Sequence, residues 1–399
     1  MVFLIKIIFE FFFILIFTLI FYEIVLFILS LFFKRNSTNS NEKRKFLILI
    51  PAFGEGDILL STVDALEKLN YPGDLLDIVL LNDGCDERVL KNIKHKIKIL
   101  DVNLEAHSKI ESLKKAIDLT DNFDFVIILD ADNLVHHDFL KELNKSITEK
   151  TKVIQGLRLP KNLNSKFEKL DAMTDFVYNQ LDRIAPSKLG LSGTLSGSGF
   201  AIRTDLFKQI IPEINTKGGF DKILQSELML QNIPVEVCKT AIVFDEKISS
   251  RENYIRQRTR WLYYHFYNSI NYGIKILLTG IFHFNLNQIH FGLKTLRPPI
   301  NLLYFLSLIL VIAGLWFCPV CSIILFAALI IFSLIIANIL RINKLLSFEL
   351  LISLPLIFIN QLFSIFRLRE AKENSLRTEH YHSKTIDEVL QDSKSLEQK

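Results

Sequence analysis

Two carboxylates stand at the end of a predicted strand near the middle of the chain. The segment DFVIILDADN, residues 124–133, is an apolar run that stops at Asp130 and Asp132. Such a run is typical of a buried strand in a parallel sheet, and ligands bind beyond the carboxyl ends of such strands. Alternate residues of an extended segment point the same way, so both side chains can face one ion. Oxygen ligands suit Mg²⁺ or Mn²⁺, which would bridge to a diphosphate.

Further acids follow the strands that are predicted earlier in the chain. Glu55 comes after the strand KFLILIP, residues 45–51, and Asp83 ends the strand LDIVLLND. Because parallel strands point one way, we expect both acids on the same edge as Asp130. Their mutual repulsion would be relieved by a metal ion or by hydroxyl and imide donors of a nucleotide. The alternative for each acid is an ordinary turn with a solvated side chain.

Two other segments could bind phosphate or approach a ligand closely. Lys109 opens a predicted helix, residues 108–120, at a position where it could neutralise a phosphate. In SGTLSGSGFAIR, the backbone N–H groups of Gly197, Ser198 and Gly199 could contact a ligand. The alternative is a plain loop before a strand.

The segment QRTRW combines basic and aromatic residues at helical spacing. Gln257, Arg260 and Trp261 would share one helix face. Arginine can clamp a diphosphate through two hydrogen bonds, and tryptophan can stack on a sugar ring. The alternative, which is compatible with this one, is an interfacial helix with its aromatic and basic residues at the lipid headgroups.

The composition predicts a membrane protein. The chain has 399 residues, 50% of them hydrophobic and 33 of them Phe, which is too apolar for an ordinary soluble protein. Residues 1–33 predict a retained transmembrane anchor rather than a signal peptide, whose apolar core is about 7–15 residues long. A polar linker, residues 34–44, follows. Residues 45–270 alternate strands and helices, which predicts an α/β domain with a mostly parallel sheet.

The C-terminal third of the sequence is again apolar and predicts further membrane segments. We expect interfacial helices over residues 271–298 and a membrane region over residues 299–366. Within that region residues 346–366 carry basic residues on both sides, which favours a re-entrant or interfacial segment over a full crossing. Basic clusters at residues 34–45, 341–344 and 367–372 predict that the α/β domain and a tail, residues 367–399, lie in the cytoplasm of a multi-pass inner-membrane protein.

The net charge and the cysteines of the sequence give little further indication of function. The net charge of +4 gives no indication of nucleic-acid binding. The four cysteines do not indicate a disulfide framework. Cys318 and Cys321, in CPVC, could do metal or redox chemistry, but a proline-containing turn between two apolar helices is favoured.

The motifs occur in an order that resembles the membrane-integrated family 2 glycosyltransferases, the group of cellulose, chitin and hyaluronan synthases. The matching segments are PAFGE, NDG, SK, DAD, GSGF, FDK and QRTRW, within residues 46–265. The resemblance implies a GT-A fold and inverting transfer from a nucleotide-sugar. Three positions depart from the usual pattern: Gly54 replaces Asn, Asn82 replaces Asp, and Phe220 replaces an acid. RTEH, residues 377–380, resembles a tail motif of some members.

The resemblance also implies a role for each motif residue. Asp221 would be the general base, since the interval 257 − 221 = 36 fits the family and that from Glu227 does not. A helix-capping role for Asp221 is the alternative. The remaining roles are nucleotide-sugar binding by Ala52, Glu55, Asp83, Lys109, Asp130, Gln257 and Arg260, acceptor binding by Gly197, Ser198, Gly199 and Trp261, and Mg²⁺ or Mn²⁺ binding by Asp130 and Asp132.

We therefore predict a membrane-bound inverting glycosyltransferase. It would use a nucleotide-sugar, a UDP-sugar first of all, and extend a polysaccharide or glycolipid acceptor, with other polysaccharide-export subunits as partners and no nucleic acid. One alternative is a transferase that moves a single sugar to a polyprenyl phosphate or another lipid. A second alternative is an inactive sugar-binding or scaffold subunit.

Overall fold

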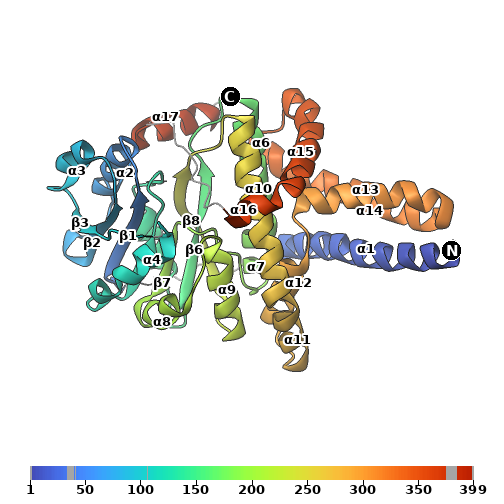
Figure 1. The fold of residues 1–399 in the computed structure, drawn as a ribbon, viewed down its shortest axis with the longest axis horizontal. Coiled ribbons are helices and arrows are strands. Elements are labelled where there is room, and N and C mark those ends of the chain that lie inside the picture. Colours follow the sequence, from blue (N-terminus) through green and yellow to red (C-terminus); the bar gives the residue numbers. More distant parts are fainter. Residues whose placement is uncertain (1, 34–39, 41, 106, 374–383, 398–399) are drawn as a thin grey trace. The chain divides into compact units, whose positions relative to one another are not determined.

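A computed structural model of the chain describes residues 2–33, 40, 42–105, 107–373 and 384–397. The chain divides into two compact units, and each is described by itself. The sheet unit consists of residues 36–168, 192–253 and 375–399, and the helical unit consists of residues 1–35, 169–191 and 254–374. Figure 1 labels their helices and strands.

The sheet unit is built on one mixed sheet of eight strands in the order β3-β2-β1-β4-β7-β6-β8-β5. The pairs β1–β2, β1–β4, β2–β3 and β6–β8 are parallel, so the predicted mostly parallel sheet is confirmed. The strands are β1 (Phe46–Phe53), β2 (Leu76–Asp83), β3 (Lys98–Asp101), β4 (Phe125–Ile128), β5 (Leu134–Val135), β6 (Val153–Pro160), β7 (Phe200–Arg203) and β8 (Val235–Asp245).

The core of this unit lies around β1. Each residue from Phe46 to Ile50 is at most 1% exposed, so both faces of the strand are covered. This explains why the strand is a continuous apolar run rather than an alternating one. The helices of the sheet unit are α2 (Ile58–Glu67), α3 (Glu87–Ile93), α4 (Lys109–Lys115), α5 (Phe139–Ser146), α8 (Thr204–Ile210), α9 (Phe220–Leu230) and α17 (Ile386–Glu397).

The last helix, α17, belongs to the sheet unit although it comes from the predicted polar tail. Ile386 and Val389 are buried in the core, and Asp387 binds Lys68 of α2 at 2.6 Å. Two apolar residues three apart thus dock one face of this helix. The RTEH segment, residues 377–380, and the basic residues Lys34 and Arg35 lie outside the described residues.

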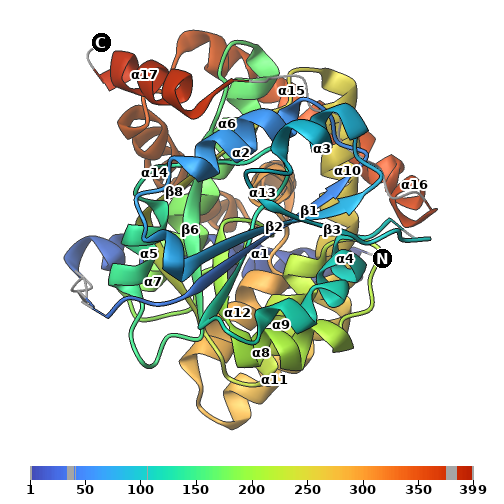
Figure 2. The same cartoon turned by 90° about the vertical axis from the view of Figure 1, so that its left-hand side faces the viewer.

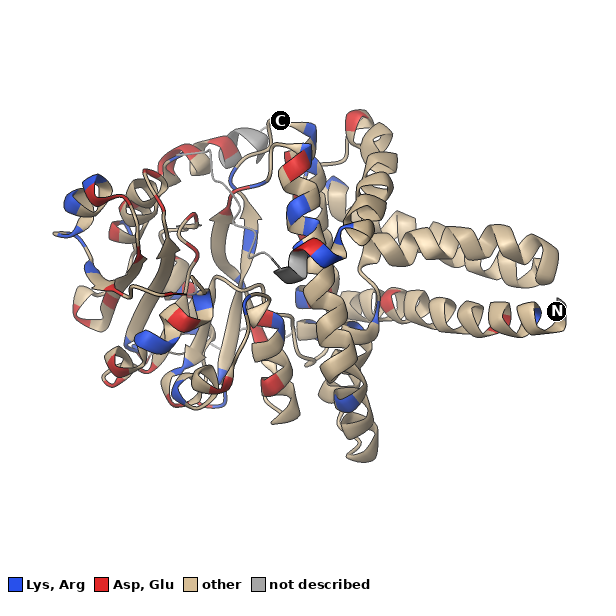
Figure 3. Ribbon diagram, viewed as in Figure 1, with Lys and Arg blue, Asp and Glu red and all other residues tan. Residues whose placement is uncertain are grey.

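In its described residues, the helical unit contains four helices that are long and apolar enough to cross a membrane. They are α1, α13, α14 and α15, and Figure 3 shows that charged residues are sparse along the first three. The helices assigned to this unit in full or in part are α1 (Val2–Phe32), α6 (Lys166–Tyr178), α7 (Ala185–Lys188), α10 (Arg251–Asn268), α11 (Ile274–Phe282), α12 (Leu286–Leu296), α13 (Ile300–Phe317), α14 (Pro319–Ile342), α15 (Phe348–Phe366) and α16 (Leu368–Glu373).

Within the helical unit the helices run in two directions. The helices α1, α13 and α14 lie along one another, and α13 is seen nearly end-on in Figure 2. The hairpin of α11 and α12 and the helix α15 run steeply across them (Figures 1 and 2). The two hairpin helices pack closely because Gly280 and Gly292 face the neighbouring backbone, where a β-carbon would lie 2.6 Å and 2.7 Å from it.

Four buried charges tie α1 to the rest of the helical unit. Glu23 of α1 accepts hydrogen bonds from Lys294 at 2.7 Å and from Arg297 at 2.8 Å. Asp182, in a π-helical segment at Asn179–Ile184, binds the same two cations at 2.8 and 2.9 Å. Burial alone would raise the pKa of Asp182, but the charges of Arg297 and Lys294 outweigh it and hold that pKa below its ordinary value.

We expect Glu23→Leu to destabilise the protein by about 3–5 kcal/mol, because it leaves two buried cations with one carboxylate between them. Glu10→Leu is the matched control in the same helix. Glu10 pairs with Lys6 at 3.9 Å and its side chain is 49% exposed, so its loss should cost at most about 1 kcal/mol. Detergent-solubilised variants would be compared by SDS titration, and equal losses would contradict this role of Glu23.

The turn between α13 and α14 holds an unexpected bond. It contains Pro319, as predicted, but Cys318 and Cys321 are joined in a disulfide. The expectation of a plain turn was therefore incomplete. Cys85 and Cys238, both in the sheet unit, are buried and are not part of a disulfide.

Candidate active site

The two central carboxylates lie in a turn, not in the strand. The strand β4 ends at Ile128, and the N–H of Asn133 donates to the carbonyl of Asp130 at 3.1 Å to close the turn. The argument from alternating residues of an extended segment was therefore wrong. Asp130 keeps a side chain that is 36% exposed, whereas Asp132 is only 8% exposed.

Asn133 and Ser198 fix this turn from two sides. The Asn133 amide donates to Asp132 Oδ1 at 3.2 Å, and the Ser198 hydroxyl donates to Asn133 Oδ1. The N–H of Asp130 donates to the same Ser198 hydroxyl at 2.9 Å. Ser198 is close because β7 runs antiparallel to β4, which brings the residues before β7 to the end of β4. Asn133 was missed in the sequence although it directly follows DAD.

Lys109 joins the acid turn to the glycine-rich loop. It opens α4, and its amine forms an ion pair with Asp130 and donates to the carbonyl of Gly197 at 2.7 Å. The same amine lies 4.9 Å from the centre of the Phe220 ring. This contact gives the unusual Phe220 a physical role, because an aromatic face attracts a cation.

Asp221 lies against the same loop. Gly197 has φ +79°, and a β-carbon at this position would lie 3.5 Å from Asp221 Cβ and 3.8 Å from its Oδ2. The N-cap residue of α9 is Gly219, so Asp221 stands in the first turn and is not the cap. Lys109 and Asp221 thus both lie at Gly197, and Lys109 also connects this loop to Asp130.

Gln155 shapes the glycine-rich loop from beneath. This fully buried side chain donates to the carbonyls of Ser198 at 2.9 Å and Gly199 at 3.1 Å, and it accepts from the N–H of Ser196 at 3.0 Å. A buried glutamine satisfied by three backbone groups holds the loop in one conformation. The sequence analysis missed Gln155. The signal that could have revealed it is a single amide side chain directly after the apolar residues that begin β6.

The ends of β1 and β2 supply the remaining predicted residues of this unit. Asp83 is 4% exposed and lies 2.8 Å from the His107 ring, which stacks on Phe53 at 3.9 Å. Ala52 is buried at the end of β1, and Glu55 follows in the loop. His107, which directly precedes the SK motif, was missed.

Asn82, which replaces an acid of the family pattern, has a structural role. Its amide donates to Asp101 of β3 at 2.6 Å, and its carbonyl accepts from the N–H of Cys85 at 3.0 Å. These bonds connect β2 to its neighbouring strand and to the turn that follows it.

A buried lysine adds positive charge near the acid turn. Lys161 follows β6, is 3% exposed, and its amine has no hydrogen-bond partner among the described residues. Burial lowers the pKa of this amine, and the negative charges of Asp132 and Glu246 only partly oppose that shift.

The QRTRW residues lie on α10, within the helical unit, so the cluster around Gly197 is described without them. Arg258 is buried, forms an ion pair with Asp171 and lies 4.6 Å from the centre of the Trp261 ring. Gln257 and Arg260 lie at half-buried positions on the same helix. Arg258 is the functional candidate that the sequence analysis passed over in this motif.

The acid turn fits a divalent cation in part. Among the described residues, no group of three or more His, Cys, Asp and Glu side chains could hold a metal ion. Asp130 and Asp132 could supply one or two carboxylates, and Mg²⁺ commonly binds proteins through that number together with water and phosphate oxygens. The donor set therefore suits an ion that arrives with a diphosphate.

A family profile described as "Glycosyltransferase like family 2" matches residues 43–264, which is more than half of the chain. The chain belongs to this family, and its sheet has the GT-A-like α/β fold that was predicted. The prediction of a glycosyltransferase enzyme is thereby confirmed at the level of the family.

Individual relatives are distant. The chain is 24% identical over 247 residues to the probable glycosyltransferase YdaM of Bacillus subtilis, and the match covers 56% of each protein. It therefore spans little more than half the length of that relative. Among solved structures, it is similar to the mannosyltransferase PcManGT of Pyrobaculum calidifontis in complex with GDP-Man and Mn²⁺ (13% identity, TM-score 0.49, 81% of this chain and 97% of that chain) and to S. aureus TarS 1-349 (16% identity, TM-score 0.40, 85% and 93%).

Gly199→Ala should disrupt the loop beyond the cost of its backbone conformation. Gly199 has φ +67°, and a β-carbon there would lie 2.8 Å from Cγ2 of the stiff, buried Val243. Gly190→Ala is the matched control, since Gly190 has φ +75° with nothing within 4 Å. We expect about 1–2 kcal/mol of destabilisation at Gly190 and a larger loss at Gly199, with transfer activity reduced only at Gly199. Thermal unfolding and transfer assays would check this, and equal effects would contradict it.

Proposed function

We propose that this protein is a membrane-bound inverting glycosyltransferase of the synthase-like type. It would transfer a sugar from a nucleotide-sugar, a UDP-sugar in the first instance, to a polysaccharide or glycolipid acceptor. The observation that carries the proposal is that Lys109 and Asp221 both lie at Gly197, while Lys109 also forms an ion pair with Asp130. The carboxylates of Asp221 and Asp130 and the amine of Lys109 supply the charges that such a transfer needs.

Each group of this cluster has a separate task in the proposed reaction. Asp221 takes the proton of the acceptor hydroxyl as it attacks the anomeric carbon from the face opposite the leaving group. The Lys109 amine, held at the Gly197 carbonyl, binds the negative charge of the leaving diphosphate. Asp130 and Asp132 would hold Mg²⁺ or Mn²⁺, which would supply further positive charge there.

The nucleoside would lie at the ends of β1 and β2. The Asp83 carboxylate faces the His107 ring, and a carboxylate at this edge can accept the imide N–H of a pyrimidine such as uracil. Ala52 and Glu55 would complete this part of the site. The aromatic pair Phe53 and His107 offers flat surfaces beside it.

The residues of α10 would act on the diphosphate and the acceptor. Gln257 and Arg260 would bind the diphosphate, and Trp261 would stack on the acceptor's terminal sugar. The Arg258 guanidinium, which forms an ion pair with Asp171, packs on one face of the Trp261 indole ring. This contact would hold the ring in place, so that its other face could stack on the sugar. Gly197, Ser198 and Gly199 would also contact the acceptor.

Trp261→Ala should reduce transfer to the acceptor about 10-fold or more while leaving nucleotide affinity within about twofold, because a lost stacking contact of this type is worth roughly 1–3 kcal/mol. Trp316→Ala is the control, since Trp316 is 77% exposed on α13. Transfer rates and nucleoside diphosphate titrations would be measured on both variants. A parallel loss of nucleotide binding in Trp261→Ala would indicate a folding defect instead.

The proposal places the sheet unit in the cytoplasm of a multi-pass inner-membrane protein. The sequence places Lys34 and Arg35 after α1, and Arg341 and Lys344 follow the apolar part of α14, where basic residues favour the cytoplasm. We propose that α15 lies in the membrane interface rather than across it, which its steep angle to α13 and α14 supports (Figure 1). The same placement is proposed for the α11–α12 hairpin.

The small number of apolar helices supports a second candidate acceptor. Four such helices are few for a self-contained export channel, so a lipid acceptor such as a polyprenyl phosphate, or separate polysaccharide-export subunits, would complete the pathway. Membranes containing the protein would be incubated with labelled UDP-sugars and separated into lipid extract and polymer. Label in the polymer would support polysaccharide synthesis, and label in the lipid extract would support transfer of a sugar to a lipid acceptor. Label in neither fraction would support an inactive scaffold subunit.

A further inference from the structure

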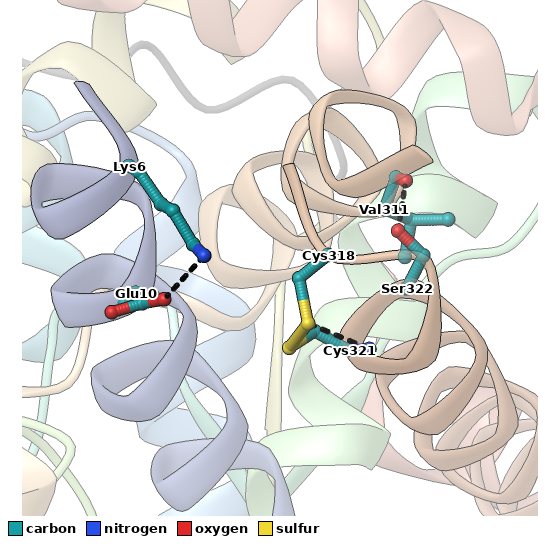
Figure 4. Close-up of a disulfide and its surroundings, with 6 residues drawn as sticks. All are labelled: Lys6, Glu10, Val311, Cys318, Cys321 and Ser322. Atoms are coloured by element: carbon teal, nitrogen blue, oxygen red, sulfur yellow. Dashed lines mark hydrogen bonds and ion pairs between the residues drawn. A yellow bond between two sulfur atoms is a disulfide. The ribbon is translucent and has the colours of Figure 1, made fainter. Parts of the chain in front are cut away.

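The turn between α13 and α14 is closed by its own backbone and by two sulfur atoms. The Cys318 N–H donates to the Gly314 carbonyl at 2.8 Å, which ends α13, and the Ser322 N–H donates to the Cys318 carbonyl at 3.1 Å, which begins α14. The disulfide joins Cys318 to Cys321, whose Cα atoms are 5.2 Å apart (Figure 4). The bond therefore lies at the extreme end of the hairpin.

This turn lies at the same end of the bundle as the start of α1. The Phe9 and Phe317 rings are 5.7 Å apart, and a β-carbon on Gly314 would lie 3.0 Å from Phe9. The Lys6–Glu10 pair of α1 lies near the disulfide in Figure 4. The end of α13 and the first turns of α1 are thus level with each other.

The buried charges mark the opposite end of the bundle. Glu23 binds Lys294 and Arg297, which immediately precede α13. The 18 residues of α13 then span about 27 Å, close to the roughly 30 Å of a hydrocarbon core. A helix of this length can reach from one surface of a hydrocarbon core to the other.

The charge of the two ends differs. The sequence from Pro298 to Leu340 contains no Asp, Glu, Lys or Arg, so the turn carries no charge, and Lys6 and Glu10 beside it cancel. The other end carries Lys294 and Arg297, which Glu23 and Asp182 neutralise, and in addition the basic residues Arg341 and Lys344. Basic residues concentrate on the cytoplasmic side, so the disulfide end faces the opposite compartment.

We propose that Cys318 and Cys321 are an oxidation site on the extracytoplasmic face of the membrane, a proposal that rests on the membrane placement given above. Disulfides persist in oxidising compartments and are rare in the cytoplasm, and Cys85 and Cys238 of the sheet unit are not part of a disulfide. The oxidant is the disulfide of an extracytoplasmic thiol oxidoreductase. One thiolate attacks it to form a mixed disulfide, and the second thiolate displaces the oxidant, which leaves as a dithiol with the two electrons and two protons.

The test is mass-tagging of the full chain in intact cells. Cells would receive a membrane-impermeant maleimide polymer with or without prior treatment by a membrane-impermeant phosphine reductant, and the shift on a gel would be read. Cys318→Ser/Cys321→Ser is the matched control for the pair. Lys150→Cys in that double-serine background reports on the sheet unit, since Lys150 is exposed there.

We expect two tags on the wild type after external reduction, none without it, and none on the double-serine control. Lys150→Cys should be tagged only after permeabilisation. Tagging of the pair without reduction would overturn the disulfide, and tagging only after permeabilisation, or external tagging of Lys150→Cys, would overturn the orientation. Sugar transfer is assayed separately, so its absence with the expected tagging pattern would reject the proposed function and leave this inference standing.

Discussion

Asp221→Asn is expected to lower the rate of sugar transfer by about 10²- to 10⁴-fold, while the protein still folds and binds nucleotide. Asparagine keeps the size of the side chain but cannot take a proton from the acceptor hydroxyl. We propose Asp221 for that task because it stands in the first turn of α9 against Gly197, whose carbonyl also binds Lys109. Initial rates and nucleoside diphosphate titration calorimetry on the purified variant would separate turnover from binding.

Glu227→Gln is the control for this prediction. Glu227 is on the same helix six residues later, a net rotation of about 240° at 3.6 residues per turn, so the two acids cannot face one site. We expect Glu227→Gln to retain transfer within a few-fold. Near-normal turnover by Asp221→Asn together with an inactive Glu227→Gln would show that the base has been assigned to the wrong residue.

Asp132→Asn is expected to reduce transfer at least about 100-fold, because it removes charge from the site that would bind the metal and the diphosphate. The amide retains an oxygen that can accept the hydrogen bond from Asn133, so the turn itself should persist. Chelation of the wild type with EDTA should have a comparable effect, and added Mg²⁺ or Mn²⁺ should reverse it. Transfer rates with and without chelator would be measured.

Asp138→Asn serves as the control for the loss of a carboxylate. Asp138 precedes α5 and pairs with Lys141 at 3.5 Å, apart from the acid turn. Its substitution should leave transfer and its dependence on metal unchanged. Full activity of the wild type in EDTA without divalent ions would contradict a metal-dependent mechanism, whatever the effect of Asp132→Asn.

The sheet could be predicted well because its central strands are continuous apolar runs. The segment LDIVLLND was predicted as a strand, and β2 covers the same residues, Leu76–Asp83. At β4 the sequence predicted a strand to Asp130, but the strand ends at Ile128. The difference arises because Ser198, 68 residues away, holds the N–H of Asp130 in a turn. A contact at that separation leaves no periodic signal.

Sequence motifs identified most residues of the candidate site, but they did not predict the contacts between those residues. Gly197 was predicted to bring its backbone close to a ligand, and the structure gives it a φ of +79°, a conformation that glycine adopts readily. The convergence of Lys109 and Asp221 on it depends on the antiparallel placement of β7, which no local pattern reveals. Gln155 was overlooked because its function is to satisfy backbone groups rather than to contact a ligand.

The helical unit shows the same limit. Apolar length predicted the N-terminal anchor and the C-terminal membrane region, and the described part of these segments contains four apolar helices long enough to cross a membrane. Glu23 appeared only as an interruption of an apolar run, since its partners Lys294 and Arg297 lie more than 270 residues further along the chain. The docking of α17 through Ile386 and Val389 was missed because two apolar residues in a polar segment carry too little periodicity to predict a buried face.

The most direct test of the central claim is turnover of a nucleotide-sugar by the purified, detergent-solubilised protein. Release of nucleoside diphosphate would be measured across a panel of UDP-, GDP- and dTDP-sugars, with and without Mn²⁺ and with membrane lipid extract as acceptor. The account predicts release from at least one donor, with UDP-sugars foremost, dependence on the metal, and loss of release in Asp221→Asn. A folded protein that binds these donors but releases no nucleoside diphosphate from any of them would contradict it.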